Sequence, residues 1–178
     1  MAWATPITWT TNQVVTSAQL NAQIRDNLNE TAPAKATTAG YHFASNGTNT
    51  IVERAILMAN VDASENTAST SYTNLGTNGP LVTMATGVQA LVWISVQQGN
   101  STNTASSATS YEVTGATTQA AGSTVAVIND STATNSLHRA GVTNLQSLTP
   151  GTNTFRMQYL VSGGTGTYLR RRLVVMGL

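Results

Sequence analysis

Alternation of apolar and polar residues with a period of two is the feature that most constrains the fold of this chain. It is clearest over residues 88–97, where every second residue is apolar: Val88, Ala90, Val92, Ile94 and Val96. Successive side chains of a β-strand point to opposite faces of its sheet, so this pattern predicts a strand. The other face carries Leu91 and Trp93. We therefore expect this strand to be covered on both sides.

Further strand-like runs follow the same rule. They lie at residues 155–161 and 167–178, and less clearly at 51–60, 80–86, 108–114, 123–129 and 136–142. Turn signals such as Asn78-Gly79-Pro80 and Gly163–Gly166 separate them. Charged residues make up only 8% of the chain, and Thr, Ser, Asn and Gly take their place. The sequence predicts a mainly β protein, an antiparallel jelly-roll-like β-sandwich over residues 51–178.

A different pattern occupies residues 1–30, which we expect to be a docking segment. An extended, Pro-containing stretch is followed by Thr16 and Gln19 at capping-box spacing, which predicts a short helix over residues 17–29. The apolar residues of this segment that are candidates for docking are Trp3, Pro6, Trp9, Leu20, Ile24 and Leu28. Two interpretations remain open: these side chains fold back on the protein's own core, or they fill a groove on a partner.

Residues 31–50 have no apolar period and are interpreted as a linker between the docking segment and the sandwich. Pro33, Gly40 and Gly47 interrupt any regular element, and Asn46-Gly47 is a turn signal that allows a small hairpin. The predicted organisation is therefore three segments, at 1–30, 31–50 and 51–178.

Several classes of partner are disfavoured by the charge and composition. The net charge is +1 and Lys35 is the only lysine, so no basic face is expected to bind nucleic acid or an anionic membrane. There is no cysteine, which excludes disulfides and thiolate metal sites. The first residues lack the basic and apolar regions of a signal peptide, and no apolar run approaches the roughly 20 residues that span a bilayer.

Catalysis is not expected, and no cofactor or metal is implied. His42 and His138 lie in no nucleophile or zinc motif. A glycosidase needs two carboxyl groups flanking one bond, and a pair such as Glu112 with Asp130 is the arrangement that the sequence leaves open. The chain is short of the other charged and aromatic groups that such sites add. We expect a protein that is not an enzyme.

Three consecutive arginines form the one dense charge feature of the chain. On a strand, Arg170 and Arg172 share one face while Arg171 points to the other face, with Leu169 and Leu173. One interpretation is two solvated arginines and one paired arginine, and the other is a ring of arginines around a subunit axis. The residues considered for a subunit interface are Trp93, Leu160, Arg170, Arg171 and Arg172.

The N-terminal run TPITWTTNQVVTSAQLNAQIRDNL resembles a segment of structural proteins of tailed bacteriophages. In that segment a Trp, a Pro and a second Trp come first, followed by Val-Thr, by Leu-Asn and by a helix that ends in Arg-Asp-Asn-Leu. The matching residues of this chain are Trp3, Pro6, Trp9, Val15-Thr16, Leu20-Asn21 and Arg25–Leu28. Two later runs resemble the terminal β domain of the same proteins at the level of pattern: TNLGTNGPLVTMATGVQALVWISVQ and LTPGTNTFRMQYLVSGGTGTYLRRRLVVMGL.

This resemblance implies a virion protein, usually trimeric, that docks by its N-terminal part and displays its β domain on the virion surface. The partner would be the major capsid protein or another virion protein, and synthesis would take place in the host cytoplasm. Tail fibres usually carry a long shaft, whereas this chain has about 20 residues between the two parts. We therefore expect a homotrimeric capsid decoration or head-fibre protein. The alternative is a tail-associated receptor-binding or minor tail protein that recognises the host surface, for example a glycan.

Overall fold

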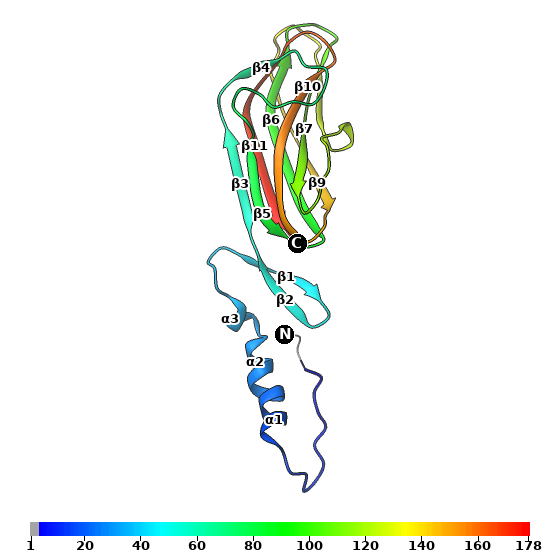
Figure 1. Ribbon diagram of the computed structural model, residues 1–178. Helices are drawn as coiled ribbons and strands as arrows, with labels where there is room; N and C mark the ends of the chain where they lie inside the picture. The colour runs from blue at the N-terminus through cyan, green and yellow to red at the C-terminus, as the bar shows by residue number, and fades with distance from the viewer. Residues whose placement is uncertain (1–3) are drawn as a thin grey trace. The chain divides into compact units, whose positions relative to one another are not determined.

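The computed structural model describes residues 4–178, and its chain divides into two compact units (Figure 1). The first unit ends at Ala55, and the second runs from Ile56 to Leu178. Trp3, one of the predicted docking residues, lies outside the described residues. The two units are described separately below.

The first unit begins with an extended segment and a helix. The helix is built from α1 (Ser17–Leu20), a π-helical stretch η1 (Asn21–Asp26) and α2 (Asn27–Asn29). The Thr16 hydroxyl accepts a hydrogen bond from the Gln19 backbone N–H, and the Gln19 side chain returns to the Thr16 backbone. This capping box satisfies backbone donors that no helical carbonyl can reach. The predicted helix over 17–29 is confirmed.

A short helix and a hairpin complete the first unit, in the region predicted as a linker. Helix α3 (Ala32–Lys35) is followed by β1 (His42–Gly47) and β2 (Thr50–Arg54), which pair antiparallel. Asn49 adopts a positive φ of 55° in the connection, a conformation that Asn tolerates better than most residues. The structure thus places residues 50–54 in this hairpin, whereas the sequence analysis began the sandwich at residue 51.

The second unit is an antiparallel β-sandwich, as predicted. One sheet has the order β5-β10-β7-β8, and the other has the order β3-β11-β6-β9, with β4 also paired to β11. Most consecutive strands lie in opposite sheets, so the chain crosses repeatedly between them (Figure 1). The strand bounds are β3 (Ile56–Val61), β4 (Glu65–Thr67), β5 (Leu81–Thr86), β6 (Gln89–Asn100), β7 (Ser106–Gly115), β8 (Val127–Asp130), β9 (His138–Ser147), β10 (Gly151–Val161) and β11 (Gly166–Gly177), with a 3-10 turn η2 (Ser123–Val125).

The core between the sheets is apolar over most of its length. Its fully buried side chains include Val92, Ile94, Tyr111, Val113, Phe155, Met157, Tyr159, Tyr168, Leu173 and Val175. Burial raises the pKa of Tyr111 to about 12, because the phenolate form is poorly solvated there. Most of these residues are alternate members of the predicted strands, so the period-two pattern identified most of the core. Tyr168 is out of phase with Leu173 and Val175 because the register of β11 shifts between them.

One end of the interior is polar and fully hydrogen-bonded. The Gln98 side chain accepts from Thr109 Oγ1 at 2.6 Å and donates to the carbonyls of Ser107 and Val127. The Asn100 amide donates to the Gly163 carbonyl at 3.0 Å. Buried amides cost little when their donors and acceptors are paired in this way.

Within the single chain, the strand over 88–97 is buried on one face only, and coverage of its second face stays a prediction. Ala90, Val92, Ile94 and Val96 are buried against the other sheet, but the opposite face of β6, with Leu91 and Trp93, is only partly buried. Within the second unit no further layer packs on that face.

Candidate docking surfaces

The extended segment before the helix is held along it by side-chain amides. Asn27, which is buried, accepts a hydrogen bond from the Ala4 backbone N–H at 2.7 Å. Gln23 accepts from the Ile7 N–H at 3.2 Å and donates to the Thr5 carbonyl at 3.1 Å. An amide has both a donor and an acceptor, so it can pair with an extended backbone as a neighbouring strand would. The path of residues 4–7 is thereby fixed.

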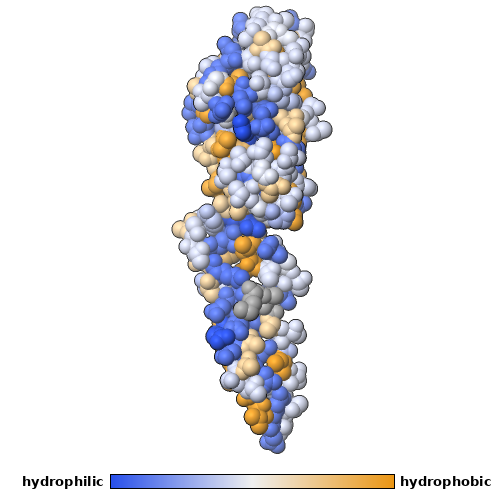
Figure 2. Space-filling model, in the orientation of Figure 1, coloured by the Kyte–Doolittle hydropathy of each residue, from blue (hydrophilic) through white to orange (hydrophobic). Residues whose placement is uncertain are grey.

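The apolar side chains of this part of the first unit remain at the surface. Trp9 is 41% exposed, and Pro6, Leu20, Ile24 and Leu28 are exposed. Figure 2 shows hydrophobic residues interrupting the hydrophilic surface of this unit. A rigid backbone that presents large apolar groups to solvent is typical of an interaction site. Of the two interpretations, burial of Trp9 in the unit's own core is not what the structure shows.

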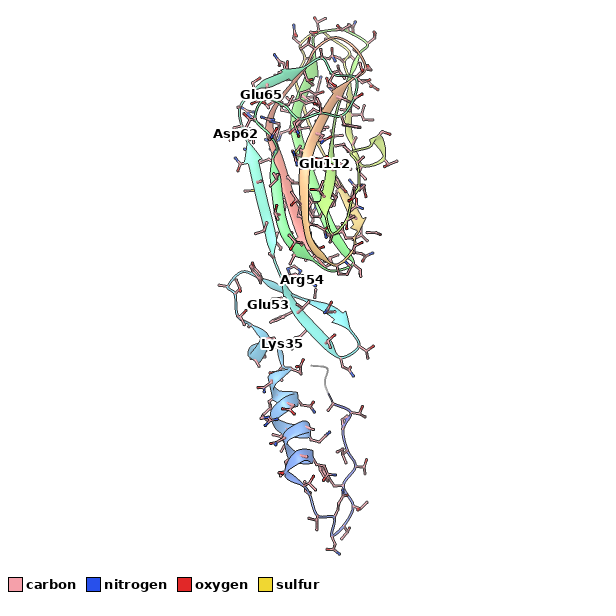
Figure 3. All side chains as sticks on the ribbon, viewed as in Figure 1. Lys35, Glu53, Arg54, Asp62, Glu65 and Glu112 are labelled. Atoms are coloured by element: carbon pink, nitrogen blue, oxygen red, sulfur yellow. The ribbon has the colours of Figure 1, made fainter. Side chains whose placement is uncertain are left out.

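Helix α3 and the hairpin are joined by the carboxylate of Glu53. It accepts hydrogen bonds from the Thr37 hydroxyl at 2.6 Å and from the Thr37 and Thr38 backbone N–H groups at 2.7 and 3.1 Å. These bonds, above all the one from the Thr37 hydroxyl, lower the pKa of Glu53 because they favour the charged form. Lys35 and Glu53 lie in the same region (Figure 3) and line an open hollow of about 260 Å³. A hollow this small and open is a poor site for a cofactor.

A second exposed surface covers the outer face of the sheet β3-β11-β6-β9. Strand register places Ile56, Met176, Leu91 and Leu145 in one row across the four strands. The next row runs Met58, Val174 and Trp93, and ends at Thr143. Met58 is 66% exposed and Leu145 is 57% exposed. We call this surface the apolar patch, and its members are Ile56, Met58, Leu91, Trp93, Leu145, Val174 and Met176.

The outer face of the other sheet has a different character. Thr83 and Thr154 share a hydrogen bond of 2.8 Å, and Arg156 pairs with Glu112 at 3.1 Å. Leu160 lies on this sheet, in β10, whereas Trp93 lies in β6 of the opposite sheet. Trp93 and Leu160 were both considered for one subunit interface, and the structure does not bring them together.

Arg171 is fully buried inside the sandwich, so it is not available to a partner and is removed from the predicted interface residues. Its Nη2 lies 3.4 Å from Glu65 Oε2, and its Nη1 donates to the carbonyls of Thr77 and Gly79, both at 3.4 Å. The guanidinium also stands over the Tyr159 ring, 5.5 Å from the ring centroid. Burial alone would raise the pKa of Glu65, but hydrogen bonds from Thr77 and the charge of Arg171 together lower it.

A β-bulge explains how three consecutive arginines separate. Register between β11 and β6 shifts between Leu169 and Arg172, so two residues stand opposite one and the alternation is broken. Leu169 is therefore partly exposed instead of sharing the buried face with Arg171. Arg172 pairs with Asp62 at 2.6 Å, and Arg170 is exposed with φ 50°. Figure 3 labels Glu65 and Asp62, the acids of the two pairs.

The carboxyl pair that the sequence left open is not brought together. Ser106, which is the register partner of Asp130, lies six positions from Glu112 along β7, which separates the two carboxyl groups by roughly 20 Å at about 3.3 Å per residue. Glycosidase carboxyl pairs need about 5–9.5 Å, so this pair is excluded. Within residues 4–178 no group of three His, Asp or Glu side chains is arranged to hold a metal ion. No helix in the same range is long and apolar enough to cross a membrane.

Comparisons with known proteins give limited likenesses. No family model and no curated protein sequence matches the chain. Among solved structures it is similar to a chain of the infectious bursal disease virus Gt strain, at 11% identity and a TM-score of 0.46, covering 75% of this chain and 37% of that one. It is also similar to a chain of the Gx strain of that virus (10%, 0.37, 75% and 40%). A third similar structure is Eiger TNF from S. frugiperda (12%, 0.37, 78% and 89%). The chain thus spans well under half of the viral chains it matches, and at these TM-scores the likeness says nothing of what it does.

Proposed function

We propose that this chain is a structural protein of a tailed-bacteriophage particle, which docks on the particle through its first unit and displays the β-sandwich at the virion surface. The observation that carries the proposal is the exposed apolar surface of the first unit, formed by Pro6, Trp9, Leu20, Ile24 and Leu28. The backbone beneath these residues is fixed by Gln23 and Asn27. The sequence of the same segment carries the resemblance to tailed-phage structural proteins.

The particular role proposed is capsid decoration or a head fibre, working as a homotrimer with the major capsid protein or another virion protein as its partner. The function is mechanical: binding to the assembled lattice stabilises it by mass action. No enzymatic step, cofactor, nucleic acid or membrane is part of this proposal.

A binding assay with particles that lack the protein tests the proposal. The full chain and a Trp9→Ala variant are mixed with such particles at several concentrations, and bound protein is separated by sedimentation. Loss of a large aromatic anchor from the centre of an interface usually costs about 2 kcal/mol or more, so we expect at least a 30-fold weaker Kd. A matched control is Val88→Ala, which removes an exposed apolar group from the second unit. Unchanged binding of Trp9→Ala, with the control also unchanged, would contradict docking through this segment.

Copy number per particle distinguishes the proposed role from the alternative, a tail-associated receptor-binding or minor tail protein. Quantitative mass spectrometry of virions should find hundreds of copies for a protein of the head lattice. A few copies, in multiples of three, would favour the tail and make binding of the isolated chain to host cells or cell-wall glycan the next experiment.

A further inference from the structure

The apolar patch on the outer face of β3-β11-β6-β9 has no partner among the described residues of the second unit. Its two rows cross all four strands, and none of its seven members is charged. The corresponding face of the opposite sheet is mixed: threonines and the Arg156–Glu112 pair lie beside Leu81 and Ile128, which are 43% and 51% exposed. The asymmetry matters because antiparallel sheets normally face water with polar side chains. The continuous apolar rows on this face indicate that it is buried in the assembled protein.

We propose that neighbouring copies of this chain cover the apolar patch, so that the subunits associate with the outer faces of their β3-β11-β6-β9 sheets turned toward a common axis. The inference rests on the homotrimer of the proposed function, for which it names the contacting face, and it does not depend on docking to a particle.

The charges around the patch fit an apolar partner surface and no other kind. The nearest charged groups on the same face are Arg172 and Asp62, which neutralise each other at 2.6 Å, and Arg139 lies further along β9. An acidic or basic partner would therefore find no counter-charge within the patch. Two copies of the patch can meet without burying an unpaired charge, which is the main penalty in such an interface.

The size of the face also suits association between copies. Strands β6, β9 and β11 have 12, 10 and 12 residues. Strand β3 has only 6 residues, so four strands about 4.8 Å apart and about 20–40 Å long give a whole face, of which the patch is a part, of roughly 650 Å². Stable interfaces bury about 600–1,000 Å² on each partner. Stacking of sheet faces about 10 Å apart is a packing mode that sandwiches already use inside one chain.

The low charge of the chain favours a partner that covers the apolar patch as soon as the protein is synthesised. With 8% charged residues and a net charge of +1, the chain has little electrostatic repulsion to prevent non-specific association. A patch of this kind would promote aggregation if it waited uncovered for a different protein. A second copy is available at the same place, time and concentration as the first.

The test uses charge insertion at side chains that are exposed in the single chain, so that folding is preserved. Met58→Glu and Leu145→Glu place a carboxylate in the patch, and Ile128→Glu places one on β8 of the other sheet, where the side chain is 51% exposed. The full-length proteins are compared by sedimentation equilibrium from about 1 to 100 μM, with circular dichroism to verify folding. We expect a wild-type oligomer of defined size, at least a 100-fold higher Kd for both patch variants, and a Kd within threefold of wild type for Ile128→Glu.

Three outcomes would overturn the inference. The first is that the wild type is a monomer at 100 μM. The second is that Ile128→Glu weakens self-association as much as the patch variants do. The third is that Ile24→Glu in the first unit abolishes self-association while the patch variants leave it unchanged. A monomer that still binds particles would refute the homotrimer and the inference together, but it would leave docking through the first unit intact. An oligomer that fails to bind particles would refute the proposed function alone.

A second measurement needs no variant and guards against misfolding of the substituted chains. Met58 is exposed in the single chain, whereas Met84 and Met157 are buried in the core and serve as internal references. Oxidation by hydrogen peroxide, followed by mass spectrometry, reports the access of each thioether. We expect Met58 to oxidise at least tenfold more slowly in concentrated than in dilute protein. An equal rate at both concentrations would contradict burial of the patch.

Discussion

Replacing Glu65 by Gln should destabilise the second unit far more than replacing Arg171 by Met, although both substitutions break the same ion pair. The asymmetry follows from burial: the Arg171 side chain is fully buried, whereas the Glu65 side chain is 19% exposed. A charged group that water can still reach stays solvated when its partner is removed, so the loss costs little. A buried charged group has no such solvation, so the loss of its partner is strongly destabilising.

The magnitude can be worked from the contacts around each group. In Glu65→Gln, the Arg171 guanidinium keeps two carbonyls at 3.4 Å and the Tyr159 ring at 5.5 Å, but no anion. Stranding a buried charge costs about 3–5 kcal/mol, and the long 3.4 Å ion pair puts this case near 3 kcal/mol. In Arg171→Met, Glu65 retains its bonds from Thr77, and a buried cation is replaced by an apolar group of similar length. The expected cost is within about 1 kcal/mol.

Urea unfolding of the full chain, followed by circular dichroism, provides the assay. In Glu65→Gln the free energy of unfolding should fall by about 3 kcal/mol. The urea concentration at the midpoint should fall by this free energy divided by the m-value, and the m-value itself should not change. In calorimetry the difference corresponds to a Tm lower by roughly 12 °C for a unit of this size. Equal destabilisation by the two variants, or a larger loss in Arg171→Met, would refute the reasoning from burial.

Three further outcomes are expected. The pKa of Glu65 is lower in the folded state than in the unfolded state. The carboxylate therefore stabilises the fold above about pH 4.3, and this stabilisation is lost as the pH falls through the folded pKa. The urea midpoint of the wild type should decline between about pH 5 and 3, and that of Glu65→Gln should decline less. Gly99→Ala should lower the free energy of unfolding by about 2–3 kcal/mol, because its Cβ would overlap the Ser136 carbonyl oxygen. Gly122→Ala is the control: the space around Gly122 is open, so the same urea titration should show a change within about 1 kcal/mol. Gln23→Ala removes two hydrogen bonds that hold the first residues on the helix, so amide exchange at Ile7 should accelerate about tenfold by NMR; an unchanged rate would show that the segment is held by other contacts.

Local signals in the sequence were sufficient for the elements that depend on local chemistry. Thr16 and Gln19 define the helix start because a capping box needs only four consecutive residues. The strands of the sandwich follow from period-two alternation, and the inward direction of Arg171 follows from its position beside Leu173. Exposure of the docking residues could also be anticipated, since a single narrow stripe on a helix does not provide a core.

Features that depend on register between distant strands could not be predicted in this way. The apolar patch joins Ile56 to Met176, which are register partners across β3 and β11 but stand at opposite ends of the second unit's sequence. The bulge in β11 adds one residue to the strand and reverses the direction of Leu169, which simple alternation misses. The Asn46-Gly47 turn signal indicated a hairpin in the predicted linker, but its second strand was assigned to the sandwich, because β2 contains no alternation that distinguishes it from the sandwich strands.

The polar end of the sandwich interior makes mutational tolerance uneven along the core. Apolar positions such as Val92 and Ile94 interact without direction, so conservative exchanges among aliphatic residues should be accepted in a selection for folded protein. Gln98 bonds to two backbone carbonyls and to Thr109 from fixed directions, and no aliphatic residue satisfies them. Deep mutational scanning should therefore show a gradient, from permissive at the apolar end to nearly invariant at Gln98 and Asn100.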